Sequence, residues 1–140
     1  MSKHFKQEEF LCPCCKKGKV NPKLIDKLET IREVIGNIPI EIVSGYRCKA
    51  YNQSIGGYVD SPHILGIAAD TKCKLRIVDY AILADLVAGI RLGIYEKHLH
   101  LDIIPANPSR FWLVKKYGQK PIYSGTETNL KNFLEKNGKL

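Results

Sequence analysis

Residues 61–70 read Ser-Pro-His-Ile-Leu-Gly-Ile-Ala-Ala-Asp, and His-Leu-His follows at residues 98–100. The two stretches supply imidazoles and a carboxylate, which are donor types that zinc takes from protein side chains. A catalytic zinc site typically has three protein ligands. Here two candidates, His63 and Asp70, are close in sequence, and the third comes from a distant segment. Small Gly and Ala residues between them let the backbone approach closely. The sequence therefore predicts a metal site assembled by a folded core.

Residues 98–103 alternate polar and apolar side chains, which is the period of a strand with one apolar face. Residues i, i+2 and i+4 of a strand point to the same side, so His98, His100 and Asp102 are expected to share one face. Only one of the two histidines needs to bind metal. The other then lies beside the metal, where it can transfer a proton or stabilise negative charge. Asp102 is placed to orient a histidine ligand.

Three upstream segments complete a recognisable pattern: residues 44–47 (Ser-Gly-Tyr-Arg), 51–52 (Tyr-Asn) and 56–57 (Gly-Gly). With Ser-x-His-x-x-Gly-x-Ala-x-Asp and His-x-His, this pattern resembles the zinc D-alanyl-D-alanine carboxypeptidases and related peptidoglycan endopeptidases. The resemblance covers most of the chain and implies a hedgehog-type metallopeptidase fold. It also implies that the substrate is a stem or cross-link peptide of peptidoglycan. Carboxypeptidase and endopeptidase activity both remain open.

Residue by residue, the resemblance implies that His63, Asp70 and His100 bind Zn²⁺. His98 is then the catalytic histidine beside the metal. Arg47 is expected to face the substrate and hold a carboxylate or the developing oxyanion, since a planar guanidinium makes bidentate contacts. Read alone, Arg47 is an exposed charge after a turn. The other substrate-binding candidates are Ser61, which either lines the pocket or only orders the turn into His63, and Tyr46 and Asn52.

The position three residues before the last zinc ligand departs from several branches of the superfamily, which place an acidic general base there. This chain has Lys97, which cannot act as that base. Glu96 lies on the face of His98 and His100 if the strand extends that far. Glu96 is therefore the reserve candidate for the base, with the main role assigned to His98.

The remaining sequence predicts one α+β domain over residues 1–140, with a small antiparallel sheet that carries the metal site and helices packed on it. Apolar residues at helical spacing predict a helix that opens at Asn21-Pro22 and ends at Gly36. The same reasoning predicts helices over residues 76–87 and 127–135. Residues 38–43 are expected to form a strand.

The formal net charge is +8, from 22 Lys and Arg against 14 Asp and Glu. Basic proteins are drawn to polyanions, which include nucleic acids and anionic cell-wall polymers. The lysines are scattered and the aromatic residues form no stacking series, so no specific nucleic-acid partner is expected. No apolar run approaches the roughly 20 residues of a membrane span, and residues 1–10 lack the apolar stretch of a signal peptide. We expect a monomer made in the cytoplasm that acts on the cell wall after release, as a phage or prophage lysis enzyme does. A bacterial wall-remodelling enzyme is the close alternative.

Five cysteines give the main rival signal. Residues 12–15 read Cys-Pro-Cys-Cys and resemble the start of a zinc ribbon, which the isolated Cys48 and Cys73 would have to complete. The odd count argues against a disulfide framework. We expect free thiols, several of them buried, with a structural metal or a bridge near residues 12–15 as the alternative. Two other functions stay open: a catalytically silent cell-wall-binding module of the same fold, and a basic nucleic-acid-binding protein with a cysteine zinc site.

Overall fold

The computed structural model describes residues 2–105 and 109–140, and its centre is a six-stranded sheet of order β1-β2-β4-β3-β5-β6. The strands are β1 (Glu41–Ser44), β2 (Ala68–Lys72), β3 (Arg91–Ile94), β4 (Leu99–Asp102), β5 (Phe111–Leu113) and β6 (Ile122–Tyr123). Neighbouring strands are antiparallel except β3 and β5, which are parallel. The expected α+β class is confirmed. The sheet is mixed, and not wholly antiparallel, because β5 pairs with β3 after a crossover from β4.

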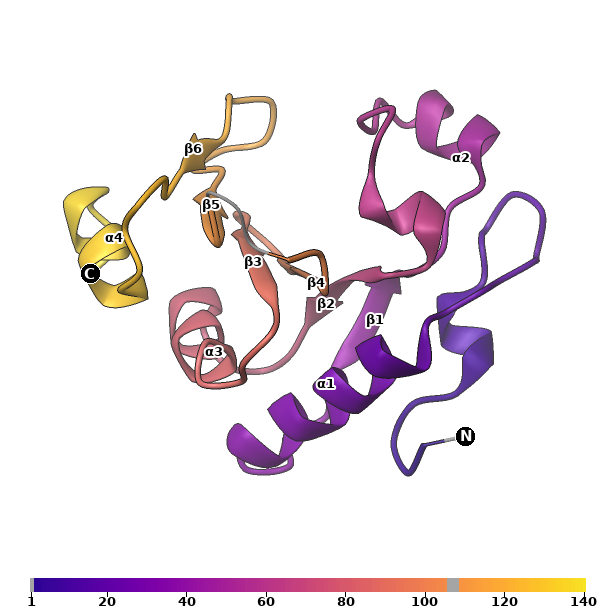
Figure 1. Cartoon of the computed structure of the whole chain (residues 1–140), viewed down its shortest axis with the longest axis horizontal. Helices are drawn as coiled ribbons and strands as arrows, with labels where there is room; N and C mark the ends of the chain where they lie inside the picture. The colour runs from indigo at the N-terminus through magenta and orange to yellow at the C-terminus, as the bar shows by residue number, and fades with distance from the viewer. Residues whose placement is uncertain (1, 106–108) are drawn as a thin grey trace.

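The helices lie on both sides of this sheet (Figure 1). They are α1 (Pro22–Val34), α2 (Lys49–Ser54), α3 (Ile77–Ala84) and α4 (Leu130–Lys136), with short 3-10 helices η1 (Gln7–Phe10) and η2 (Pro62–Leu65). Figure 1 shows α1 and α3 next to each other on one side of the sheet, and α2 on the other side. The hydrophobic core, which includes buried residues of α1 and α3, lies on their side of the sheet. The side that carries α2 is therefore available for a polar site.

The ends of α1 follow from its sequence. Asn21 caps the helix, its side chain accepting a hydrogen bond from the Lys23 N–H at 2.9 Å, and Pro22 occupies the first helical position. Beyond the other end, Gly36 adopts φ +85°, a left-handed conformation that glycine tolerates without strain. The buried face of α1 carries Leu24, Ile25, Leu28 and Ile31. The helix expected from Asn21 to Gly36 is thus confirmed.

Strand β4 separates the core from the site. Leu99 and Leu101 belong to the hydrophobic core, together with buried residues of α1 and α3. Burial of such a leucine side chain contributes about 1.5–3 kcal/mol. Successive side chains of a strand point to opposite faces, so His100 and Asp102 face away from this core. The apolar residues of β4 thereby fix which face the polar ones occupy.

Several expected elements differ from the observed ones in their bounds. The strand expected over residues 38–43 is β1, at Glu41–Ser44; the helices expected over 76–87 and 127–135 are α3 and α4. Strand β4 begins at Leu99, so His98 lies outside it, because the Tyr95 N–H donates to the His98 carbonyl at 3.1 Å and closes a turn there. The sequence pattern did not predict α2, β2, β3, β5 or β6.

No disulfide joins any of the five cysteines, all of which lie within the described residues. The expectation that several are buried is wrong, because only Cys12 is buried; Cys14 is exposed and the other three are intermediate.

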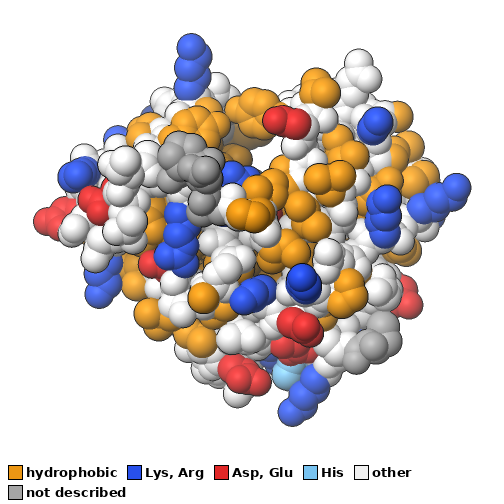
Figure 2. Space-filling model, in the orientation of Figure 1, with side chains coloured by type: hydrophobic (Ala, Val, Ile, Leu, Met, Phe, Trp, Pro, Cys, Tyr) orange, Lys and Arg blue, Asp and Glu red, His pale blue; other side chains and the backbone are white. Residues whose placement is uncertain are grey.

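Lys and Arg side chains are scattered over the face drawn in Figure 2, between hydrophobic and acidic ones. Among the described residues, no helix has both the length and the apolar character that crossing a membrane requires.

We predict that Gly93→Ala destabilises the protein and displaces Trp112. Gly93 pairs with His100 on one side and Trp112 on the other, and a Cβ there would lie 2.5 Å from the Trp112 ring. Such overpacking costs about 1–3 kcal/mol of the free energy of unfolding. Urea unfolding measures the loss, and the fluorescence of Trp112, the single tryptophan, reports its displacement.

Gly118→Ala is the matched control, because its Cβ would meet nothing within 4 Å although φ is +85°. It should lose stability through backbone strain alone and leave the Trp112 emission unchanged. Unchanged emission in Gly93→Ala would contradict the packing described for this pair.

Candidate metal centre

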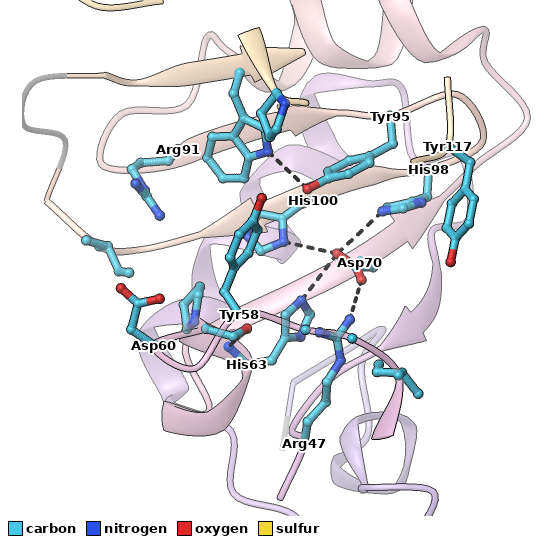
Figure 3. A pocket seen from close by; sticks show the side chains of 18 of the residues that line it. Arg47, Tyr58, Asp60, His63, Asp70, Arg91, Tyr95, His98, His100 and Tyr117 are labelled. Atoms are coloured by element: carbon cyan, nitrogen blue, oxygen red, sulfur yellow. Dashed lines mark hydrogen bonds and ion pairs between the residues drawn. The ribbon is translucent and has the colours of Figure 1, made fainter. Parts of the chain in front are cut away.

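Asp70 and His100 face each other across neighbouring strands. In the antiparallel register of β2 and β4, Asp70 pairs with His100. Directly opposed side chains of an antiparallel pair lie on one face, with Cβ atoms about 5 Å apart. His100 Nδ1 accordingly lies 3.0 Å from Asp70 Oδ1 (Figure 3). The register of β2 and β4 therefore brings two of the three expected ligands together.

His63 reaches the same carboxylate from η2. Ser61 caps this short helix, its Oγ accepting from the His63 N–H at 3.3 Å, and Gly66 ends it with φ +72°. A Cβ at Gly66 would collide with a neighbouring backbone carbonyl, so this tight turn requires glycine. The turn places His63 Nε2 3.3 Å from Asp70 Oδ1. The three atoms of the expected ligand set thus converge, all within 4.8 Å of one another.

The outer nitrogen of each ring is held by an acceptor. His63 Nδ1 lies 2.7 Å from the Gly45 carbonyl, which accepts only if this nitrogen carries the proton. His100 Nε2 lies 2.8 Å from Asp102 Oδ2, which favours a proton on that nitrogen. In the neutral rings, the inner nitrogens are then lone pairs, and both point at Asp70 Oδ1. Three electron-rich atoms that converge need a proton or a cation among them, so the donor set fits a metal ion.

The second oxygen of Asp70 is held by Arg47. Arg47 Nη2 donates to Asp70 Oδ2 at 2.9 Å, and its Nε donates to Ser44 Oγ at 3.1 Å. In the metal-free protein, burial opposes ionisation of Asp70, but the close contacts with the His100 and His63 rings outweigh it and hold the pKa of this carboxyl well below its usual range. Asp70 is therefore a carboxylate, with Oδ1 turned to the histidines and Oδ2 to the guanidinium.

A second buried carboxylate supports His100 from behind. Asp102 is fully buried and accepts two hydrogen bonds from Arg91, from Nε and Nη2, each at 2.9 Å. Burial disfavours a charged His100, but the hydrogen bonds to Asp102 and Asp70 outweigh this and raise its pKa to about 9. In the absence of a metal ion, a proton therefore occupies the contact between His100 and Asp70.

His98 lies at the edge of the site although it is outside β4. Its Nε2 is 3.7 Å from Asp70 Oδ1, and its ring stacks on Tyr95 with centroids 4.4 Å apart. Burial lowers the pKa of His98, so the imidazole is neutral near neutral pH. Tyr95 is itself fixed by Trp112, whose Nε1–H donates to the Tyr95 hydroxyl at 3.1 Å. His98 is thus a positioned, neutral imidazole next to the converging ligand atoms.

These groups open into a cleft of about 750 Å³. Figure 3 shows the three histidines and Asp70 at its floor, with Tyr58, Tyr95 and Tyr117 around the entrance. A cleft of this size accommodates a segment of peptide.

The structure brings together most, not all, of the residues expected at the site. His63, Asp70, His98, His100, Arg47 and Ser61 line the cleft, and Ser61 also caps η2. Tyr46, Asn52 and Glu96 do not, among the described residues. Asn52 is buried behind the cleft, where Oδ1 accepts from Arg47 at 3.3 Å and Nδ2 donates to the Tyr58 carbonyl at 2.7 Å. Glu96 is exposed on the turn before β4, because the strand does not extend to it.

Three residues of the site were not anticipated: Arg91, Tyr95 and Trp112. The available signal was the alternation of Arg91-Leu92-Gly93-Ile94, which is typical of a strand with one polar face. This strand pairs with β4 so that Arg91 is opposite Asp102. Trp112 comes from β5, and its proximity to the site depends on the parallel pairing with β3.

We predict that His100 titrates near pH 9 in the metal-free protein and that Asp102→Asn lowers this midpoint toward about 6.5. Loss of the Asp102 charge removes stabilisation of the imidazolium. Because the pKa is raised in the folded state, the stability it contributes is full below about pH 6.5 and is lost as the pH rises through about 9. NMR titration of the histidine ring nitrogens measures both midpoints.

His98 is the internal control for this titration, since burial lowers its pKa and it should titrate below His100. An equal midpoint for His100 in the wild type and Asp102→Asn would contradict the role of Asp102.

One comparison with known proteins, against family models, agrees with this geometry. The family described as Peptidase M15 matches residues 3–102, a range that includes all four residues at the cleft floor. The comparison with curated proteins gives no match. Members of the matched family are zinc peptidases. The chain belongs to the peptidase M15 family.

Proposed function

We propose that this protein is a zinc-dependent peptidase that cleaves stem or cross-link peptides of peptidoglycan. The observation that carries the proposal is the convergence of His63 Nε2, His100 Nδ1 and Asp70 Oδ1, with each histidine oriented from behind. Membership of a family of zinc peptidases supports the choice of zinc and of peptide hydrolysis.

His63, Asp70 and His100 would hold the zinc ion. Zinc bound there supplies a Lewis acid that lowers the pKa of water and polarises the scissile carbonyl. Gly45 and Asp102 keep the two imidazoles in the tautomers that present a lone pair. Arg47 fixes the orientation of the Asp70 carboxylate through Oδ2 and leaves Oδ1 for the metal.

His98 is the proposed catalytic histidine. Its imidazole is neutral and lies beside the ligand atoms, so Nε2 can accept the proton of the attacking water and pass it to the leaving amine. The stack on Tyr95 restricts the ring to this position. Glu96, exposed on the turn, is not positioned for the same task.

Arg47 is also the proposed anchor for the substrate. It lines the cleft and carries a charge that suits a carboxylate of the peptide. Its present partners, Ser44, Asn52 and Asp70, hold the guanidinium at the floor of the cleft. The net charge of +8 favours approach to anionic wall polymers. The biological role we propose is lysis by a phage or prophage enzyme, with bacterial wall remodelling as the close alternative.

Replacement of any proposed ligand should remove one zinc ion and abolish activity, because a three-ligand site cannot lose a ligand and retain tight binding. We expect His63→Ala, Asp70→Ala and His100→Ala each to bind one equivalent of zinc fewer than the wild type. Zinc content after dialysis gives the stoichiometry, and mass spectrometry of digested peptidoglycan gives the activity and the bond cut.

His4→Ala is the matched histidine control, since His4 pairs with Glu29 in another part of the chain. It should keep the zinc content of the wild type. A full zinc complement in any ligand variant would show that the ligand set is wrong, and an inactive wild type that binds zinc would favour the silent wall-binding module.

His98→Ala should keep zinc and lose about 100-fold or more in activity, the usual scale for loss of an acid–base group. The three proposed ligands are intact in this variant, so circular dichroism and zinc content should match the wild type. The rate of peptide release from purified cell walls measures the loss.

Glu96→Gln is the matched control and should remain active. The reverse ranking, with Glu96→Gln inactive and His98→Ala active, would move the proton transfer to Glu96. Loss of zinc in His98→Ala would mean that the two histidines are assigned in the wrong order.

A further inference from the structure

Three cysteines meet beside the β1–α2 connection (residues 45–48), and none of them lines the cleft. The sulfurs of Cys12, Cys15 and Cys48 lie within 4.8 Å of one another, and those of Cys12 and Cys48 are 3.7 Å apart. Two come from the N-terminal segment and one from the residue that caps α2. This cluster plays no part in the peptidase mechanism described above.

The backbone of the N-terminal segment folds into a tight turn around the first two thiols. The Cys12 N–H donates to the Lys17 carbonyl at 2.7 Å, and the Lys16 N–H donates to the Cys12 carbonyl at 2.9 Å. Lys16 has φ +58°, a conformation that is uncommon for a residue with a side chain. The turn brings Cys12 and Cys15, three residues apart, to the same side.

Backbone N–H groups point at two of the sulfurs. The Cys48 N–H donates to Cys12 Sγ at 3.5 Å, and the Tyr51 N–H donates to Cys48 Sγ at 3.4 Å. Hydrogen bonds of this kind stabilise a thiolate, which is the form of cysteine that binds metal. Two of the three sulfurs, those of Cys12 and Cys48, are therefore in surroundings that favour the ionised form.

The spacing of the Cys12 and Cys48 sulfurs matches a metal site better than a disulfide. Sulfurs bound tetrahedrally to zinc at about 2.3 Å lie about 3.8 Å from one another, which is close to the 3.7 Å between Cys12 and Cys48. A disulfide requires about 2.05 Å. We propose that Cys12, Cys15 and Cys48 bind a structural Zn²⁺, separate from the histidine site. Water would complete the fourth position of an ion bound there, because Cys15 and Cys48 are partly exposed.

The same segment supports the histidine site. The Phe10 carbonyl accepts from the Tyr46 N–H at 2.9 Å, and a Cβ at Gly45 would lie 2.6 Å from Phe10 Cα. The carbonyl of Gly45 orients His63, and Arg47 precedes Cys48 directly. A cation held by the three thiolates therefore fixes the connection that carries both groups. The proposed thiolate site does not depend on the proposed peptidase function.

The test isolates the thiolate site in the full chain with the variant His63→Ala/His100→Ala. After zinc loading and dialysis under reducing conditions, we expect one equivalent of zinc, with sulfur neighbours at about 2.3 Å in X-ray absorption spectra. Adding Cys12→Ser or Cys48→Ser should weaken binding by about 100-fold or more, whereas Cys73→Ser, the matched control, should leave it unchanged. Cys73 lies outside the cluster. A folded double variant without zinc would overturn the proposal.

A second measurement uses the wild type and does not depend on the folding of variants. Zinc should protect three of the five thiols from alkylation, and a chelator should expose them. Mass spectrometry then identifies the protected residues. Protection of a different set of cysteines, or a Cys12–Cys48 disulfide in protein purified under reducing conditions, would overturn the site. Failure of the peptidase assays would leave both readouts unaffected.

Discussion

A buried carboxylate, Asp70, holds the site together. A charge removed from water is costly unless it is paired and hydrogen-bonded, and here each oxygen has its own partners. Oδ1 contacts His63 from η2 and His100 from β4, and Oδ2 contacts Arg47 from the β1–α2 connection. Three separate segments of the chain are thereby tied to one residue of β2.

The position of Asp70 depends in turn on strand register. Its neighbour Ala69 belongs to the hydrophobic core, and β4 places Leu99 and Leu101 in the same core. A shift by one residue in β2 would turn Asp70 toward that core and Ala69 toward the cleft. The apolar packing of alternate residues therefore determines where the polar side chains of the site lie.

The sequence was sufficient where function depends on local patterns. The turn from Ser61 to Gly66 and the alternation around His100 both depend on short-range chemistry. The choice of His63, Asp70 and His100 as one set came from the family resemblance, and the structure brings these three side chains together. Asn52 shows the limit of such reasoning. It matches a motif that suggests substrate contact, but its side chain is buried between Arg47 and the Tyr58 carbonyl. Only the packing of α2 decides whether the Asn52 side chain faces the substrate or is buried behind the cleft.

Long-range pairing explains the residues that the sequence did not indicate. Arg91 reaches Asp102 because β3 pairs with β4, and Trp112 reaches the cleft because β5 pairs in parallel with β3. Gly93 of β3 lies between His100 of β4 and Trp112 of β5, and a Cβ at this position would overlap the Trp112 ring. No local signal around Trp112 specifies a parallel partner some twenty residues earlier.

The β1–α2 connection links these features to the N-terminal segment. Within four residues it carries the carbonyl that orients His63, the guanidinium that holds Asp70 and the thiol that meets Cys12. Its other support is the η1 residue Phe10, whose carbonyl accepts from the Tyr46 N–H. The match to the peptidase family begins at residue 3 and so includes this segment. The N-terminal residues are thus a structural part of the domain: they support from behind the loop on which the geometry of Asp70 and His63 depends.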